Sequence, residues 1–212
     1  GCWPIVSDWA KTNVMEVLDA DGRGLRELGA DGSALHEVSP TVALENAFAD
    51  YTGAADCLSL VNGTTAIRTA LWALGVGDGD EVICPSYTFW STTMPVVGLG
   101  AKVVFAEVDP ETLNLDPEDV ERRITEKTKA VIPVHMFGLP ADLDALVRVC
   151  KKHGIHMIED CCLAPGARYR DRHVGNFGSF GCFSMQAGKG LPAGEGGLLI
   201  SNDRERFEDA VA

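Results

Sequence analysis

Short apolar runs of four to six residues alternate along this chain with amphipathic helical patterns. Residues that favour turns, chiefly glycine, proline and aspartate, separate the two kinds of segment. An apolar run too short for a helix is typical of a strand buried on both faces, and such strands are usually connected by covering helices. The alternation therefore predicts an α/β fold with three layers, in which helices cover both faces of a mostly parallel, mixed sheet.

The expected elements can be placed along the chain from these patterns. Strands are predicted for residues 56–61, 81–84, 102–106, 130–134, 155–158, 178–185 and 197–201. Helices are predicted for residues 41–51, 64–74, 89–98 and 141–152, and from residues 117 and 203 onward. Asp116 is the expected N-cap of the helix that starts at Pro117. Pro95 is expected to bend or shorten the helix over 89–98.

Length and charge limit the classes of function. The 212 residues suffice for one domain or two small ones. A net charge of −13, from 31 acidic and 18 basic residues, disfavours nucleic acid and anionic lipid as partners. No apolar run reaches the ~18 residues of a membrane span, and no signal-peptide pattern is visible. A cytoplasmic protein without nucleic-acid or membrane partners is therefore expected.

The seven cysteines do not form a metal-binding pattern. There is no CxxC pair and no Cys/His spacing of the zinc type. Five of them lie in or beside apolar segments, which is typical of reduced, buried thiols: Cys57, Cys84, Cys150, Cys161 and Cys182. Neither a disulfide framework nor a metal site is expected.

Lys189 and Asp160 carry the strongest chemical signal. Lys189 stands in a glycine-rich, almost uncharged stretch, and Asp160 ends the apolar strand 155–160. A pyridoxal phosphate site needs such an amine for a Schiff base and such a carboxylate to keep the pyridine nitrogen protonated. Taken singly, each residue has another interpretation. Lys189 fits an exposed loop, and Asp160 fits a helix cap or an ion pair with Arg168 or Arg170.

Three further segments fit the same kind of site. Thr64 and Thr65 begin a helix after an Asn-Gly turn, where free N–H groups and hydroxyls can bind a phosphate. Phe89 follows a strand end, where an aromatic ring can stack on a cofactor, and Ser184 offers a second phosphate donor. The alternatives are a plain threonine N-cap, core packing of the aromatics and a strand-end serine.

As a set, these segments resemble the DegT/DnrJ/EryC1/StrS sugar aminotransferases, a family of fold type I pyridoxal phosphate enzymes. The similarity extends over about residues 41–202 and is carried by several short motifs. They are Asn62-Gly63-Thr64-Thr65-Ala66, Gly77-Asp78-Gly79-Asp80-Glu81-Val82-Ile83, Pro85-Ser86-Tyr87-Thr88-Phe89, Pro133-Val134-His135-Met136-Phe137-Gly138, Ile158-Glu159-Asp160 and Gly194-Glu195-Gly196-Gly197.

The resemblance implies roles for individual residues. Lys189 would bind the cofactor covalently and move the proton, and Asp160 would pair with the pyridine nitrogen. Phe89 would stack on one face of the ring and Cys162 would pack on the other. Phosphate contacts are implied for Thr64, Thr65 and Ser184. The implied reaction moves an amino group from an amino acid, typically L-glutamate, to a keto sugar, usually nucleotide-linked, or to a keto cyclitol.

The resemblance also implies a homodimer with its active site at the interface. Residues 41–212 would form the cofactor-binding large domain, with residues 1–40 packing on it. A C-terminal small domain would lie beyond Ala212. One position departs from the family pattern, because Leu163 stands where many members carry a hydrogen-bonding Gln or His. A sugar dehydratase and a non-catalytic regulatory domain are the alternatives, although the dehydratase branch has histidine in place of Lys189.

Overall fold

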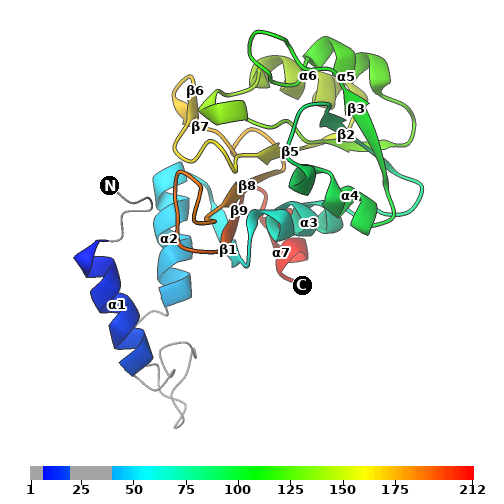
Figure 1. The fold of residues 1–212 in the computed structure, drawn as a ribbon. Coiled ribbons are helices and arrows are strands. Elements are labelled where there is room, and N and C mark those ends of the chain that lie inside the picture. The colour runs from blue at the N-terminus through cyan, green and yellow to red at the C-terminus, as the bar shows by residue number, and fades with distance from the viewer. Residues whose placement is uncertain (1–6, 20–39) are drawn as a thin grey trace.

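A single seven-stranded sheet forms the centre of the structure, a computed structural model that describes residues 7–19 and 40–212. The strand order is β1-β9-β8-β5-β4-β2-β3 (Figure 1). The strands are β1 (Asp56–Leu60), β2 (Glu81–Pro85), β3 (Lys102–Ala106), β4 (Thr128–Val131), β5 (His156–Asp160), β8 (Phe180–Ser184) and β9 (Gly197–Ser201). β9 pairs antiparallel with both of its neighbours, and every other pair in this sheet is parallel.

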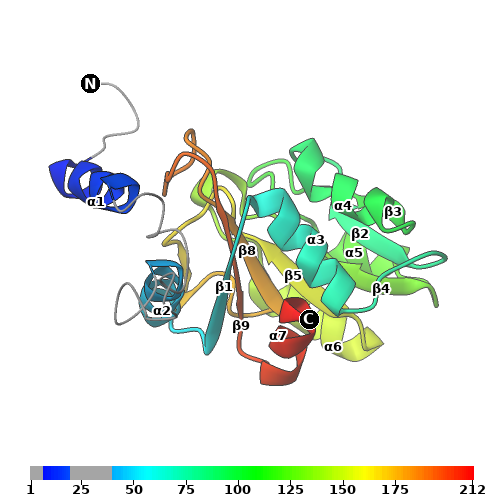
Figure 2. The same cartoon turned by 90° about the horizontal axis from the view of Figure 1, so that it is seen from below.

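Helices cover both faces of the sheet, as Figure 2 shows from below. One face carries α3 (Gly63–Ala73), α4 (Met94–Gly98) and α7 (Arg204–Val211). The opposite face carries α2 (Pro40–Thr52), α5 (Pro117–Arg123) and α6 (Leu143–His153). Short 3₁₀ turns, η2 (Trp90–Thr92) and η3 (Met136–Gly138), and a small hairpin of β6 (Arg168–Tyr169) and β7 (Arg172–His173) complete the connections. The predicted three-layer α/β/α class is confirmed.

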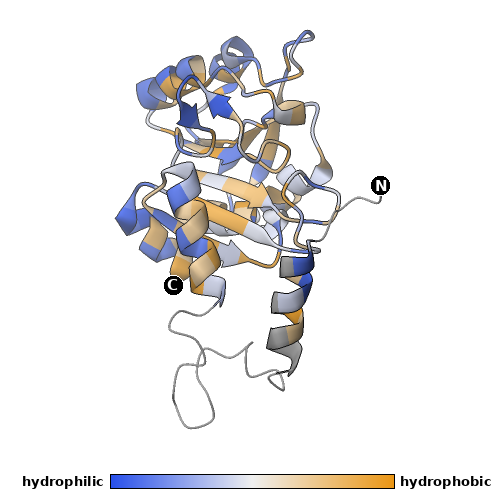
Figure 3. Ribbon diagram, turned by 90° about the vertical axis from the view of Figure 1, so that its left-hand side faces the viewer, coloured by the Kyte–Doolittle hydropathy of each residue, from blue (hydrophilic) through white to orange (hydrophobic). Residues whose placement is uncertain are grey.

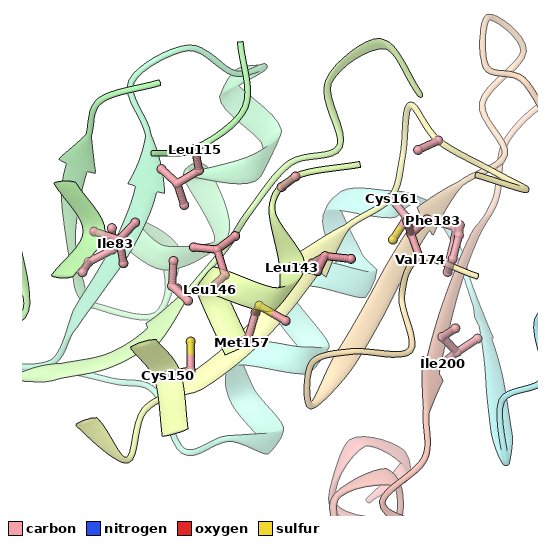
Figure 4. Close-up of a cluster of buried hydrophobic side chains, with 14 of the residues drawn as sticks. Ile83, Leu115, Leu143, Leu146, Cys150, Met157, Cys161, Val174, Phe183 and Ile200 are labelled. Atoms are coloured by element: carbon pink, nitrogen blue, oxygen red, sulfur yellow. The ribbon is translucent and has the colours of Figure 1, made fainter. Parts of the chain in front are cut away.

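Alternation along the strands divides the core into two clusters. In β2, Val82 and Cys84 belong to the cluster under α3, whereas Ile83 belongs to the cluster under α6. Met157 and Ile158 of β5 divide in the same way, because successive side chains of a strand point to opposite faces. Figure 4 shows the cluster under α6, and Figure 3 shows the apolar residues concentrated on the central strands. Burial on both faces explains why the strands are apolar runs rather than alternating patterns.

Most predicted elements agree with the structure to within a few residues. Strands 102–106 and 197–201 match in full, and Asp116 caps α5 by accepting a hydrogen bond from the Glu118 amide. The single helix expected over 89–98 is wrong, since η2 and α4 are separate with Thr93 between them. Pro95 lies in the first turn of α4, and its missing N–H cannot continue a helix from the preceding residues. The β6–β7 hairpin was not expected.

The expectation for residues 1–40 falls largely outside the described residues, because residues 1–6 and 20–39 are not described. The remaining part of it forms α1 (Asp8–Asp19), which lies apart from both helix layers in Figures 1 and 2. Among the helices of the described chain, none has both the length and the apolar character needed to cross a membrane.

The expected burial of five cysteines is confirmed. Cys57, Cys84, Cys150, Cys161 and Cys182 are free and buried, as predicted, and Cys2 lies outside the described residues. Burial, with a smaller contribution from the charge of Glu45, raises the pKa of Cys57 to about 12. Burial likewise raises the pKa of Cys150 to about 12.

The Glu159 carboxylate fixes the end of β5. It is fully buried, and its Oε1 accepts hydrogen bonds from the amides of Phe177 at 2.6 Å and Gly178 at 2.9 Å. Oε2 accepts from the amide of Gly175 at 2.8 Å and pairs with His135 Nε2 at 3.1 Å. His135 Nδ1 accepts from a backbone amide, so Nε2 carries the ring proton and donates it to the carboxylate. Four donors thus hold one buried charge, which ties the loop 175–178 and β5 together.

We predict that Glu159→Gln lowers the free energy of unfolding by about 2–4 kcal/mol, because its NH₂ group would face N–H donors and leave them unsatisfied. Urea denaturation of the purified protein measures the change. Glu126→Gln, at an exposed position, is the matched control and should stay within about 0.5 kcal/mol of the parent. Equal stability of the two variants would contradict this account of Glu159.

Candidate active site

One edge of the sheet gathers the candidate residues. Strands β1, β2, β4, β5 and β8 run in the same direction, so their carboxyl ends meet there. The antiparallel β9 begins at this same edge, which brings the β8–β9 loop into the group. A cavity of about 680 Å³ opens here. Among the residues that line it are Thr64, Phe89, Asp160, Cys162, Leu163, Ser184 and Lys189.

Asp160 presents a buried carboxylate to the cavity. It is 4% exposed, and its Oδ2 accepts a hydrogen bond from Thr92 Oγ1 at 2.8 Å, while Oδ1 accepts from the Cys162 amide at 3.1 Å. The alternative of an ion pair with an arginine is wrong. Arg168 contacts Asp171 and His173, and Arg170 pairs with Asp144. Within residues 7–19 and 40–212 no cationic side chain forms an ion pair with Asp160, and a buried charge of this kind needs a positive partner.

Lys189 lies in the β8–β9 loop and is only partly exposed. The loop is held as a hairpin by backbone bonds from Met185 to Gly196 and from Ala187 to Gly194, each 2.8 Å long. Lys189 and Asp160 line the same cavity, so Lys189 is not the exposed loop lysine of the alternative interpretation. The site therefore combines an amine and a carboxylate from two different chain segments.

Cys162 lies close to both charged groups. Burial, followed by the negative charge of Asp160, raises the pKa of its thiol well above the usual value, and the positive charge of Lys189 opposes this change. The thiol therefore stays protonated at neutral pH and behaves as a small apolar wall.

The amino end of α3 forms the anion-binding part of the site. Asn62 caps the helix, and its Oδ1 accepts from the Thr65 amide at 2.8 Å and the Thr65 hydroxyl at 2.9 Å. The Ala66 amide bonds to the Asn62 carbonyl. In the described chain no hydrogen bond involves the amides of Gly63 and Thr64, and both residues line the cavity. Free first-turn amides at the positive end of a helix bind phosphate well.

The two threonines expected at this end are placed differently. Thr64 faces the cavity, whereas Thr65 does not line it, because its hydroxyl belongs to the Asn62 cap. The helix is thus capped by Asn62 rather than by a threonine. Ser184 lies beside this helix end, and its Oγ accepts a long bond of 3.4 Å from the Gln186 amide, so its proton is available to a ligand.

Two glycines allow the backbone segments to meet here. A Cβ added to Gly63 would lie 2.8 Å from Cys162 Sγ and 2.9 Å from Ser184 Cβ. A Cβ added to Gly197 would lie 2.2 Å from the Asn62 carbonyl oxygen. The close packing of the α3 amino end against β8 and β9 therefore requires glycine at both positions.

Aromatic side chains form the open side of the cavity. Phe89 is 63% exposed and contacts Trp90 at 5.4 Å between ring centroids, so the alternative of core packing is wrong for Phe89. Phe137 is 72% exposed and adopts a left-handed backbone conformation with φ 51°, a strained geometry that is concentrated at functional sites.

Sequence patterns alone missed several lining residues. Thr88 and Thr92 lie in the strand-end segment that contributed Phe89, and their Oγ1 atoms are 2.8 Å apart. The spacing of four residues between Thr88 and Thr92 could have indicated this contact only if the interruption of the expected helix at Thr93 had been known. Trp90, Phe137, Gln186 and Glu195 also line the cavity. Phe137 and Glu195 stand in motifs that carry the family resemblance, but no role was predicted for them.

The described residues contain one group of potential metal ligands, which includes Glu159, the neighbour of Asp160 in β5. His135, Glu159 and Cys161 are buried with their ligand atoms within 4.8 Å of one another. Glu159 already accepts from three amides and from His135, and His135 Nδ1 accepts from Ala141. Burial raises the pKa of the Cys161 thiol well above its usual value. These groups are engaged in the fold, and their arrangement favours a structural role.

The arrangement fits a phosphorylated pyridine aldehyde. Asp160 supplies a buried carboxylate that forms no ion pair with any described residue, and Lys189 supplies an amine in the same cavity. Gly63, Thr64 and Ser184 supply donors for a phosphate in this cavity. Schiff-base formation, protonation of a ring nitrogen and phosphate binding are the three demands of pyridoxal phosphate.

Comparison with known proteins identifies the family. The model of the DegT/DnrJ/EryC1/StrS aminotransferase family matches residues 26–212. The chain is 50% identical over 157 residues to L-glutamine:2-deoxy-scyllo-inosose aminotransferase of Micromonospora echinospora, covering 74% of this chain and 37% of that protein. It is 41% identical to L-glutamine:scyllo-inosose aminotransferase of Streptomyces griseus, covering 96% of this chain and 47% of that protein.

Solved structures agree with this result. The aminotransferase from Psychrobacter cryohalolentis superposes with a TM-score of 0.90 at 32% identity, covering 100% of this chain and 51% of that one. The chain spans about half or less of the length of the relatives that it matches. The match over residues 26–212 and the agreement in fold show that this chain belongs to the DegT/DnrJ/EryC1/StrS aminotransferase family.

Proposed function

We propose that this chain provides the cofactor-binding part of a pyridoxal phosphate-dependent aminotransferase acting on a keto cyclitol, with L-glutamine as the amino donor. The observation that carries the proposal is the cavity that brings Lys189 and Asp160 together beside the free amides of α3. Pyridoxal phosphate is the cofactor of this family, and the donor set of the cavity fits it.

Each residue has a definite task in this proposal. Lys189 Nζ would hold the cofactor covalently, and as a free amine it would be the base that accepts the proton from the amino-bearing carbon of the donor. Asp160 keeps the ring nitrogen protonated, and Gly63, Thr64 and Ser184 bind the phosphate. Phe89 covers one face of the ring, and Cys162 packs on the other. The cofactor, when bound, supplies an electron sink that stabilises negative charge at the reacting carbon.

The identity of the substrates rests on the relatives. Both of the named relatives use L-glutamine, and their acceptors are keto cyclitols. The resemblance alone implied L-glutamate as the typical donor, and a keto sugar, usually nucleotide-linked, or a keto cyclitol as the acceptor. The 50% identity to the 2-deoxy-scyllo-inosose enzyme favours L-glutamine and a cyclitol.

We also propose that the active site is completed by a second copy of the chain in a homodimer. Three aromatic side chains at the open side of the cavity support this view, because Phe89, Trp90 and Phe137 are each at least 60% exposed. Exposed aromatics grouped around a cavity mouth are typical of a surface that is covered in an assembly.

We predict that Lys189→Ala abolishes covalent attachment of the cofactor in the cavity of the purified protein, because the Schiff base needs this amine. Addition of pyridoxal phosphate, borohydride reduction and mass spectrometry of the peptide that contains position 189 measure this. Lys151→Ala, an exposed lysine on α6, is the control and should retain the adduct of the parent. A Lys189→Ala protein that still carries the cofactor as a covalent adduct in the cavity after borohydride reduction would refute the lysine assignment.

We predict that Asp160→Asn lowers the rate of amino-group uptake from L-glutamine about 150- to 5000-fold, because breaking a buried ion pair costs about 3–5 kcal/mol. Stopped-flow absorbance at saturating cofactor measures the rate. Asp209→Asn, which is exposed, should react like the parent. A mutant rate within threefold of the parent would remove Asp160 from the chemistry.

The substrate proposal has a direct test. L-glutamine alone should bleach the cofactor absorbance, and a keto cyclitol such as 2-deoxy-scyllo-inosose should restore it with formation of the amino cyclitol, detected by mass spectrometry. Restoration by a nucleotide-linked keto sugar but not by the cyclitol would favour the sugar acceptor. A coloured protein that no amino donor bleaches would favour the regulatory alternative.

A further inference from the structure

We propose that Thr92 is a positioning residue for the cofactor, which orients the Asp160 carboxylate through a hydrogen bond that Thr88 in turn orients. The inference rests on the proposed function, since it concerns the group that Asp160 holds. It starts from two contacts between side chains, Thr92 Oγ1 to Asp160 Oδ2 and Thr88 Oγ1 to Thr92 Oγ1, each 2.8 Å long.

The direction of both hydrogen bonds follows from the number of protons. An ionised carboxylate only accepts, so the single hydroxyl proton of Thr92 is donated to Asp160. Thr92 therefore has only lone pairs left for Thr88, and Thr88 must be the donor of the second bond. The chain of donation runs in one direction, from Thr88 through Thr92 to Asp160.

Burial makes this relay rigid. Thr92 is 2% exposed and Asp160 is 4% exposed, so water does not replace either partner. The bond joins residues 68 positions apart in the sequence, and it crosses over β4, which lies between β2 and β5 in the sheet. With the Cys162 amide on Oδ1, the Thr92 hydroxyl on Oδ2 leaves the carboxylate no freedom to rotate about its terminal bond.

The interruption of the helix before Pro95 leaves Thr92 in a separate 3₁₀ turn with its side chain buried. The Thr92 amide bonds to the Phe89 carbonyl at 3.0 Å, which closes the 3₁₀ turn η2, and α4 starts anew at Met94. In this turn Phe89 and Trp90 are exposed while Thr92 is buried. The same short turn thus provides both the aromatic wall and the group that fixes the carboxylate.

Substitutions at three threonines test the inference. Thr92→Val keeps the shape and removes the hydroxyl, Thr92→Ser keeps the hydroxyl, and Thr88→Val removes only the outer donor. Thr93→Val is the matched control, since the Thr93 hydroxyl bonds to the Trp90 carbonyl at 3.0 Å and the residue does not line the cavity. The dissociation constant of pyridoxal phosphate for the apoprotein is measured by absorbance titration, and kcat and KM for L-glutamine are measured at saturating cofactor.

We expect Thr92→Val to raise the dissociation constant and lower kcat about tenfold or more, as for loss of a hydrogen bond to a charged group. KM for L-glutamine should stay within twofold, because Thr92 acts on the carboxylate that faces the ring nitrogen. Thr88→Val should show a smaller change of the same kind, while Thr92→Ser should restore most of the affinity and Thr93→Val should match the parent.

Two results would overturn the inference without touching the proposed function. One is a Thr92→Val protein whose affinity for pyridoxal phosphate and whose kcat equal those of the parent, where the parent itself is coloured and active. The other is a Thr92→Ser protein as impaired as Thr92→Val, which would assign the effect to packing of the lost methyl group. If the parent protein itself binds no pyridoxal phosphate, the inference and the proposed function both fall.

Discussion

Two adjacent carboxylates at the end of β5 have different roles, one in the packed interior and one in the cavity. Because successive side chains point to opposite faces, Glu159 enters the packed interior and Asp160 opens into the cavity. Glu159 receives four hydrogen bonds and needs nothing more. Asp160 receives two hydrogen bonds and forms no ion pair within residues 7–19 and 40–212. One acid therefore stabilises the fold, and its neighbour is kept for a ligand.

Much of the framework could be predicted because the strands are buried on both faces and therefore appear as uninterrupted apolar runs. Asp116-Pro117 was placed correctly by cap chemistry, and the strand 197–201 was placed correctly by its apolar run. Lys189 and Asp160 could be predicted to lie together because each lies at or after the carboxyl end of a strand. The carboxyl ends of parallel strands lie at the same edge of the sheet. The relay through Thr92 could not be predicted, since it depends on the break that Pro95 makes in a segment with helical periodicity.

The same limit explains the difference at the amino end of α3. Thr64 and Thr65 are neighbours with identical side chains, yet one faces the cavity and the other completes the Asn62 cap. Which of two such residues reaches a ligand depends on how the first turn of the helix is rotated about the helix axis, and packing fixes this rotation. Gly63 and Gly197 determine the rotation because they let α3 approach β8 and β9 to contact distance. Glycine spacing therefore carries information about the site that hydroxyl residues do not.

The reversed direction of β9 has a consequence for how this scaffold can diverge. Parallel neighbours are joined by crossovers whose lengths vary freely, but β8 and β9 are joined by a hairpin. Backbone hydrogen bonds join the two ends of the segment 185–196. An insertion in this segment would therefore move the Lys189 amine away from Asp160. Relatives with altered substrates are thus expected to keep this segment constant in length and to gain or lose residues in the βα connections.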